Sequence, residues 1–127
     1  MKKIIILLLL INFNFTNSFS MEADVFVQST VNRAAETLGG GLTKEERMDE
    51  LKSIAIKSVD IKGIGLYTLG AYRKDLSDTQ KEEYHDLFKS YFLKSFSDRL
   101  SDYTDPKINV ISQEKLNDKY TIVSSIL

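Results

Sequence analysis

Apolar residues recur at steps of three and four along most of the chain, a spacing typical of amphipathic helices. The first predicted helix covers residues 22–38, and three glycines at 39–41 end it. The second begins at Thr43, because Thr43 and Glu46 have the spacing of a capping box. The N-terminal half of the chain is therefore expected to be helical.

A third helix is predicted from Asp60, a favourable N-cap residue, to about Arg73. Its glycines, Gly63, Gly65 and Gly70, each weaken a helix by about 1 kcal/mol relative to alanine. Gly63 and Gly70 share one face of this helix, where the missing side chains would let another element approach closely.

The fourth predicted helix has the strongest periodic signal. Ser77 is its expected N-cap and Gln80 the reciprocal partner of a second capping box. One side of the helix then carries large apolar side chains and one serine, namely Tyr84, Leu87, Phe88, Tyr91, Phe92, Ser95 and Phe96. Pro106 ends the helical part of the chain.

Beyond Pro106 the pattern changes to alternation, which is typical of strands. Residues 108–112 and 120–127 predict a hairpin, joined by the polar residues 113–118. The predicted fold class is α+β, with an N-terminal layer of about four helices packed on an antiparallel β-sheet of which only the first hairpin is present. Two strands alone are marginal in water. Either the helices cover them or the chain is the front part of a longer protein, and we expect truncation.

The first 20 residues are predicted to be a cleavable signal peptide. Lys2 and Lys3 form a positive start, residues 4–11 an unbroken apolar run, and residues 18–20 a peptidase-type pattern of small residues. The apolar run is far shorter than the roughly 20 residues of a spanning helix. An uncleaved N-terminal anchor is the alternative. Residues 21–127 are expected to form a single exported domain.

Charge and cysteine content narrow the function further. The chain has 17 Lys and Arg against 18 Asp and Glu, and its net charge is −1. Nucleic-acid binding requires a basic surface, so no nucleic-acid partner is expected. Because there is no cysteine, neither a disulfide nor a lipid-anchored cysteine can form, and the fold must depend on packing.

Candidate catalytic and metal-binding residues are few. His85 is the single histidine, and one histidine without cysteine makes a poor metal site. The glycine-containing stretches 39–44 and 63–68 lack the Gly-Lys-Ser/Thr ending and the third glycine of the known phosphate-binding loops. No nucleophile elbow occurs. We therefore expect no enzyme, no metal and no cofactor.

The aromatic side of the fourth helix has two interpretations. Most amphipathic helices bury such a stripe in the core, against a sheet or another helix. Large flat side chains also line pockets for apolar ligands, which contain few polar groups. The residue pattern alone favours a role in the core.

Residues 59–100, VDIKGIGLYTLGAYRKDLSDTQKEEYHDLFKSYFLKSFSDRL, resemble the MlaC family, also called toluene-tolerance auxiliary proteins. The matching positions are Val59-Asp60, Leu69-Gly70, Tyr72, the helix start Ser77 to Gln80, and Tyr84, Phe88 and Tyr91. The resemblance covers about residues 22–127. Family members continue with further strands and a C-terminal helix, which is a second reason to expect truncation.

The resemblance implies a periplasmic phospholipid carrier of Gram-negative bacteria, with acyl chains held between a helical layer and a curved antiparallel sheet. It implies retrograde lipid transport that maintains outer-membrane asymmetry. The implied partners are phospholipid, an inner-membrane ABC transporter complex with its periplasmic substrate-binding subunit, and an outer-membrane lipoprotein complex. The predicted lipid-binding residues are Val59, Leu66, Leu69, Phe88, Tyr91, Phe92, Phe96, Ile108 and Val110.

Two alternatives stay open at this stage. One is a periplasmic non-lipid binding or chaperone-like module with a closed core. The other is a small exported enzyme that uses His85.

Overall fold

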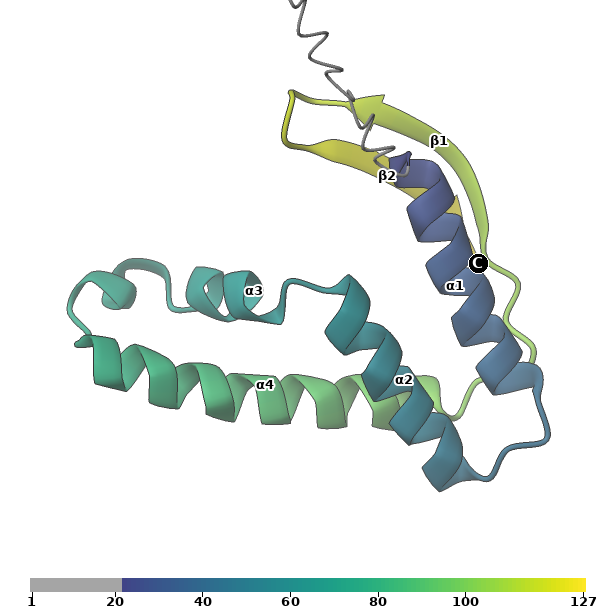
Figure 1. The fold of residues 1–127 in the computed structure, drawn as a ribbon, viewed down its shortest axis with the longest axis horizontal. Coiled ribbons are helices and arrows are strands. Elements are labelled where there is room, and N and C mark those ends of the chain that lie inside the picture. Colours follow the sequence, from purple (N-terminus) through teal and green to yellow (C-terminus); the bar gives the residue numbers. More distant parts are fainter. Residues whose placement is uncertain (1–21) are drawn as a thin grey trace, which may run out of the picture.

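The computed structural model describes residues 22–127 and confirms the α+β fold class. Four α-helices are followed by a single antiparallel hairpin (Figure 1). The elements are α1 (Ala23–Gly39), α2 (Lys44–Ser58), α3 (Ile61–Thr68), the 3₁₀ segment η1 (Gly70–Lys74), α4 (Asp78–Leu100), β1 (Asn109–Lys115) and β2 (Thr121–Ile126). The predicted signal peptide, residues 1–20, lies outside the described residues.

The predicted helix starts are confirmed by their hydrogen bonds. At α2 the Glu46 amide donates to Thr43 Oγ1 at 3.2 Å, and the Thr43 amide donates to Glu46 Oε2 at 2.8 Å. Ser77 and Gln80 form the same reciprocal pair at α4, with distances of 3.3 and 2.9 Å. These bonds satisfy amides that a helix leaves without an internal partner in its first turn.

The third helix is shorter than predicted. It begins at its expected N-cap, where Asp60 Oδ1 accepts from the Gly63 amide at 2.9 Å. The α-helix ends at Thr68 instead of continuing to about Arg73, and η1 follows. Gly70 has a φ of 55°, in the left-handed region that glycine adopts without steric cost. This conformation cannot continue a right-handed helix, so the chain turns here.

One glycine of this segment allows a close approach, but it is Gly65 and not Gly63 or Gly70. A Cβ atom at Gly70 would meet nothing within 4 Å, and one at Gly63 would meet the Asp60 cap of its own helix. A Cβ at Gly65 would lie 2.9 Å from Cδ1 of Phe88 on α4. The prediction that Gly63 and Gly70 admit a neighbouring element was therefore wrong, because the ring of α4 packs on Gly65.

The hairpin is longer on its first strand than predicted. β1 continues to Lys115, which pairs with Thr121, so residues 113–115 belong to the strand and not to the loop. Their polar side chains are exposed, and strand pairing uses the backbone whatever the side-chain polarity. The connection closes with the Leu116 amide donating to the Tyr120 carbonyl at 2.9 Å.

β1 also contains a bulge. Val110 pairs with Ser125 and Ser112 with Ser124, which leaves Ile111 as an extra residue without a partner on β2. A bulge interrupts the alternation of side chains and increases the local twist of the strand. The simple alternation predicted through residues 108–112 therefore holds only up to Val110.

The helices and the hairpin divide into two arms that meet at α2 (Figure 1). α4 packs against α2 and α3, whereas α1 packs against α2 and both strands. Gln28 of α1 joins the helix to β1 with both groups of its amide. Its Nε2 donates to the Ile108 carbonyl at 3.2 Å, and its Oε1 accepts from the Val110 amide at 2.9 Å.

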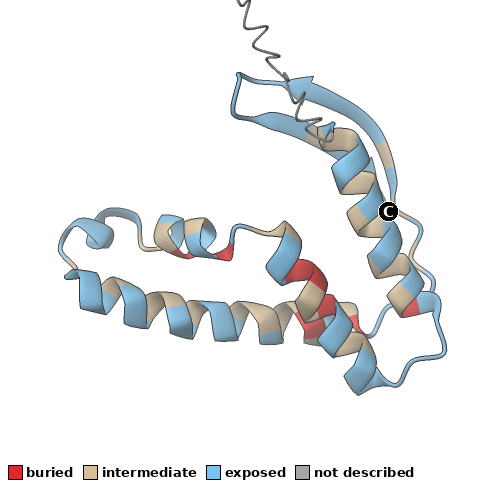
Figure 2. Cartoon of the chain, in the orientation of Figure 1, coloured by how far each residue is buried: buried red, intermediate tan, exposed pale blue. Residues whose placement is uncertain are grey.

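The most buried residues gather where α2 crosses α4 and at the adjacent helix ends (Figure 2). The buried apolar side chains are Leu38, Leu51, Ile54, Ala55 and Ile61. Ser97 of α4 and Ser101, the C-cap residue of this helix, are also fully buried. Their hydroxyls donate to carbonyls of α4 itself, Lys94 at 3.2 Å and Asp98 at 3.0 Å, so burial leaves neither donor unsatisfied.

None of the helices in residues 22–127 combines the length and apolar composition that crossing a bilayer requires.

Replacing Ser77 by alanine removes the side-chain acceptor at the start of α4. We expect Ser77→Ala to lower the free energy of unfolding by about 1 kcal/mol. The matched control is Ser90→Ala, in the exposed middle of the same helix, which should be neutral or slightly stabilising because alanine is the better helix former. Urea unfolding followed by circular dichroism measures both, and equal effects would contradict the capping role.

Adding a side chain at Gly65 would force the Phe88 ring away from α3. We expect Gly65→Val to cost about 1–3 kcal/mol of unfolding free energy through overpacking. Gly41→Val is the control, because a Cβ there meets nothing within 4 Å and its cost should stay within about 0.5 kcal/mol. Chemical denaturation of both variants gives the comparison; a Gly65 variant as stable as the control would refute the close contact.

Candidate functional site

A column of four aromatic rings runs along α4, formed by Tyr84, Phe88, Phe92 and Phe96. We call it the ring column. Successive centroids lie 6.0, 6.2 and 5.8 Å apart, with interplanar angles of 23°, 27° and 12°. Residues four apart in a helix are displaced by about 40° around its axis, so the column winds slowly around α4. Offset stacking at these distances fixes the rings as one continuous apolar surface.

The contacts with α3 hold the first half of this column in place. Phe88 packs on Gly65, as described above. The Thr68 hydroxyl donates to the Gly65 carbonyl at 2.6 Å, so its lone pairs accept from the Tyr84 hydroxyl at 2.8 Å. The polar tip of Tyr84 is thereby satisfied, while its ring stays in the apolar column.

A hollow of about 470 Å³ lies at the α3 end of the ring column, and we call it the α3 hollow. Its apolar walls come from Leu69, Tyr72, Leu76, Tyr84 and Leu87, and its polar residues are Thr68, Gln80 and Glu83. Leu87 is 65% exposed. The volume falls in the range of ligand-binding clefts, whose walls are mostly apolar with a few polar groups.

A second hollow, of about 210 Å³, follows along the same helix. We call it the ring hollow. It is lined by Phe88, Tyr91, Phe92, Ser95, Phe96 and Arg99. Tyr91 is 71% exposed, which is high for a side chain of this size. A contiguous exposed apolar surface of this kind marks an interaction or ligand-binding site more often than a free surface.

A smaller apolar hollow, of about 130 Å³, lies in the other arm of the molecule. It is lined by Ala34, Ala35, Leu38, Leu100, Tyr103, Pro106, Ile108 and Leu127. These residues come from α1, the end of α4, the connection between α4 and β1, and the C-terminal residue after β2. This hollow is smaller than most ligand sites.

The structure brings some of the predicted lipid-binding residues together and separates others. Phe88, Tyr91, Phe92 and Phe96 line the ring hollow, and Leu69 lines the α3 hollow.

The other predicted residues lie elsewhere. Val59 and Leu66 are half-buried and line none of these three spaces. Ile108 lines the smaller hollow of the other arm, which Leu100 at the end of α4 also lines, and Val110 is half-buried beside Gln28. Neither residue lines the ring hollow or the α3 hollow.

Four apolar residues of the α3 hollow were absent from the predicted set, namely Tyr72, Leu76, Tyr84 and Leu87. Tyr84 and Leu87 belong to the predicted apolar stripe, so helical periodicity alone could have included them. Tyr72 and Leu76 reach the hollow because the chain turns at Gly70 and returns toward α4. Periodicity contains no signal for such a turn.

The charges beside the ring hollow are partly paired. Lys94 Nζ donates to Asp98 Oδ2 at 2.7 Å, and this hydrogen bond lowers the pKa of the Asp98 carboxyl below its ordinary value. At neutral pH the Asp98 carboxylate is therefore ionised and paired with Lys94.

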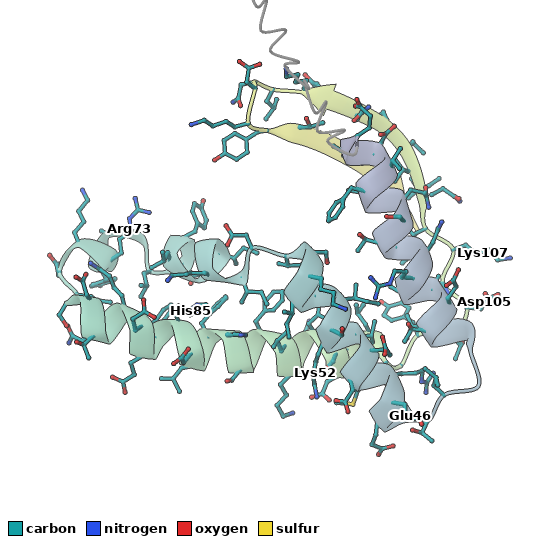
Figure 3. All side chains as sticks on the ribbon, in the orientation of Figure 1. Glu46, Lys52, Arg73, His85, Asp105 and Lys107 are labelled. Carbon is teal, nitrogen blue, oxygen red and sulfur yellow. The ribbon has the colours of Figure 1, made fainter. Side chains whose placement is uncertain are left out.

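His85 lies on the side of α4 that faces α3 (Figure 3). It is half-buried, and its Nδ1 is shielded from solvent without a hydrogen-bond partner among residues 22–127. In the same part of the chain, no group of three or more His, Asp or Glu side chains is placed to hold a metal ion.

Comparison with known proteins identifies a family. The family model described as MlaC protein matches residues 27–127, which is most of the chain and includes both hollows. No curated protein and no solved structure matches this sequence. The chain belongs to the MlaC family.

Proposed function

We propose that residues 21–127, released from the signal peptide, carry phospholipid through the periplasm and hold its acyl chains on the exposed side of α4. MlaC proteins are periplasmic phospholipid-binding proteins of lipid transport, and the family is not one of enzymes. Family membership supports the proposal at this level.

The observation that carries the proposal is the ring column with an open apolar hollow at each end. An acyl chain is a long apolar ligand without hydrogen-bonding groups, and it matches a continuous apolar strip better than a compact pocket. The exposed side chains of Leu87 and Tyr91 would be covered by the ligand.

Such a surface binds lipid without a chemical reaction, through the burial of hydrocarbon alone. Each methylene group removed from water gains about 0.8 kcal/mol. A membrane provides nearly the same gain, so the net preference of the carrier over a bilayer is small. A small net preference is what allows a carrier both to receive a lipid and to release it.

Direction must then come from partner complexes. By family membership we propose an inner-membrane ABC transporter complex, with its periplasmic substrate-binding subunit, at one end and an outer-membrane lipoprotein complex at the other. The carrier would return phospholipid from the outer to the inner membrane and so help to keep the outer membrane asymmetric. The open hollows favour this function over a binding module with a closed core.

The test is lipid binding by the purified chain. Lipids extracted from the protein and analysed by mass spectrometry should include phospholipid, and the protein should take up more from vesicles. The variant Tyr91→Glu places a carboxylate in the ring hollow, where an acyl chain would lie. We expect bound lipid to fall by at least about tenfold, because a carboxylate is costly to cover with hydrocarbon.

The matched control is Tyr67→Glu. Tyr67 is a tyrosine of α3 that is 81% exposed and lines neither hollow, so lipid binding should stay at the wild-type level. Wild-type protein that carries no lipid and takes none up, or equal losses in both variants, would refute the proposed function.

A further inference from the structure

A second row of side chains runs beside the ring column on α4. It consists of Tyr91, Ser95 and Arg99, which are spaced four residues apart and therefore neighbour one another on the helix surface. All three line the ring hollow together with Phe88, Phe92 and Phe96. The ring hollow thus has an aromatic wall on one side and a wall with three hydrogen-bond donors on the other.

The same three residues also border a polar hollow of about 300 Å³, which adds Lys94 and Asp98. The row of Tyr91, Ser95 and Arg99 is therefore the shared wall between an apolar and a polar space. A ligand that covers both spaces must be amphiphilic, with a hydrocarbon part over the rings and a polar part beyond the row.

The polar hollow has an excess of one positive charge. Asp98 is engaged by Lys94 at 2.7 Å, whereas Arg99 forms no ion pair with any residue between 22 and 127. Within that range the Ser95 hydroxyl also lacks a hydrogen-bond partner. Arginine has a planar fork of donors that matches phosphate oxygens, and a serine hydroxyl can supply one more donor. The ligand group that fits these donors is a phosphate.

The α3 hollow, at the other end of the ring column, carries the opposite charge. The α3 hollow contains the carboxylate of Glu83 and the amide of Gln80. An anionic group would be repelled by Glu83 and attracted by Arg99. Charge along α4 therefore favours one orientation of an anionic amphiphile over its reverse.

We infer that Arg99, assisted by Ser95, binds the phosphate of the lipid headgroup, while the acyl chains run along the ring column toward the α3 hollow. This inference rests on the proposed function and adds to it a headgroup contact and a direction for the bound lipid. Arg99 also lies in the last turn of α4, where a cation stabilises the helix dipole, so the test must separate binding from stability.

The test compares two lipids that differ in the phosphate. Phosphatidylcholine vesicles contain equal amounts of phosphatidylglycerol and of diacylglycerol with the same acyl chains. The purified protein is incubated with them and separated by flotation, and its bound lipids are quantified by mass spectrometry. We expect wild-type protein to enrich phosphatidylglycerol over diacylglycerol about threefold to tenfold relative to the vesicles.

Arg99→Gln should bring this ratio close to that of the vesicles. Arg33→Gln, which removes an equal charge from an exposed position on α1, should keep the wild-type ratio. Urea unfolding of both variants checks the helix-dipole effect, which alters stability and leaves the lipid ratio unchanged.

Three other outcomes would refute either the headgroup contact or the proposed function. If wild-type protein binds both lipids but Arg99→Gln leaves their ratio unchanged, the headgroup contact is refuted and the carrier function stands. If Arg99→Gln loses both lipids equally, Arg99 acts through the fold and the inference is again refuted. If wild-type protein binds neither lipid, the proposed function itself fails.

Discussion

The structure depends on α4 being packed on part of its circumference only. α2 and α3 both pack against it, and the Phe88 ring of α4 lies directly on Gly65 of α3. The missing side chain of Gly65 allows this close contact. The rest of the helix surface keeps large apolar side chains without cover, including Leu87 and Tyr91. Cores are normally closed by packing from all sides, so this one-sided support is what turns a core-like stripe into an accessible surface.

This arrangement reconciles the two interpretations of the aromatic stripe. The ring column serves as core where it meets α3 and as an open wall farther along, because a series of residues four apart rotates gradually around the helix. Phe88 packs on Gly65 and also lines the ring hollow. Core and open wall are thus two parts of one row.

The helices, their first residues and the apolar side of α4 were predictable from the sequence, because capping boxes and helical periodicity are local patterns. The turn at Gly70 was not, because the three glycines of that segment look equivalent in sequence and only the fold shows which one is left-handed and which one touches Phe88. The bulge at Ile111 and the extension of β1 to Lys115 also escaped prediction, since pairing depends on the partner strand. The predicted site was assembled from α4 and the strands together, yet the hairpin packs on α1.

The amide of Gln28 occupies the outer edge of β1 as a peptide group of a neighbouring strand would. It donates to the Ile108 carbonyl and accepts from the Val110 amide, the two groups that flank Asn109 on that edge. Exposed strand edges are templates for aggregation. With Gln28 at its start and the unpaired Ile111 directly after, this edge offers no regular ladder to a foreign strand. One side chain of a helix thereby occupies the positions on this edge where a foreign strand would begin to pair.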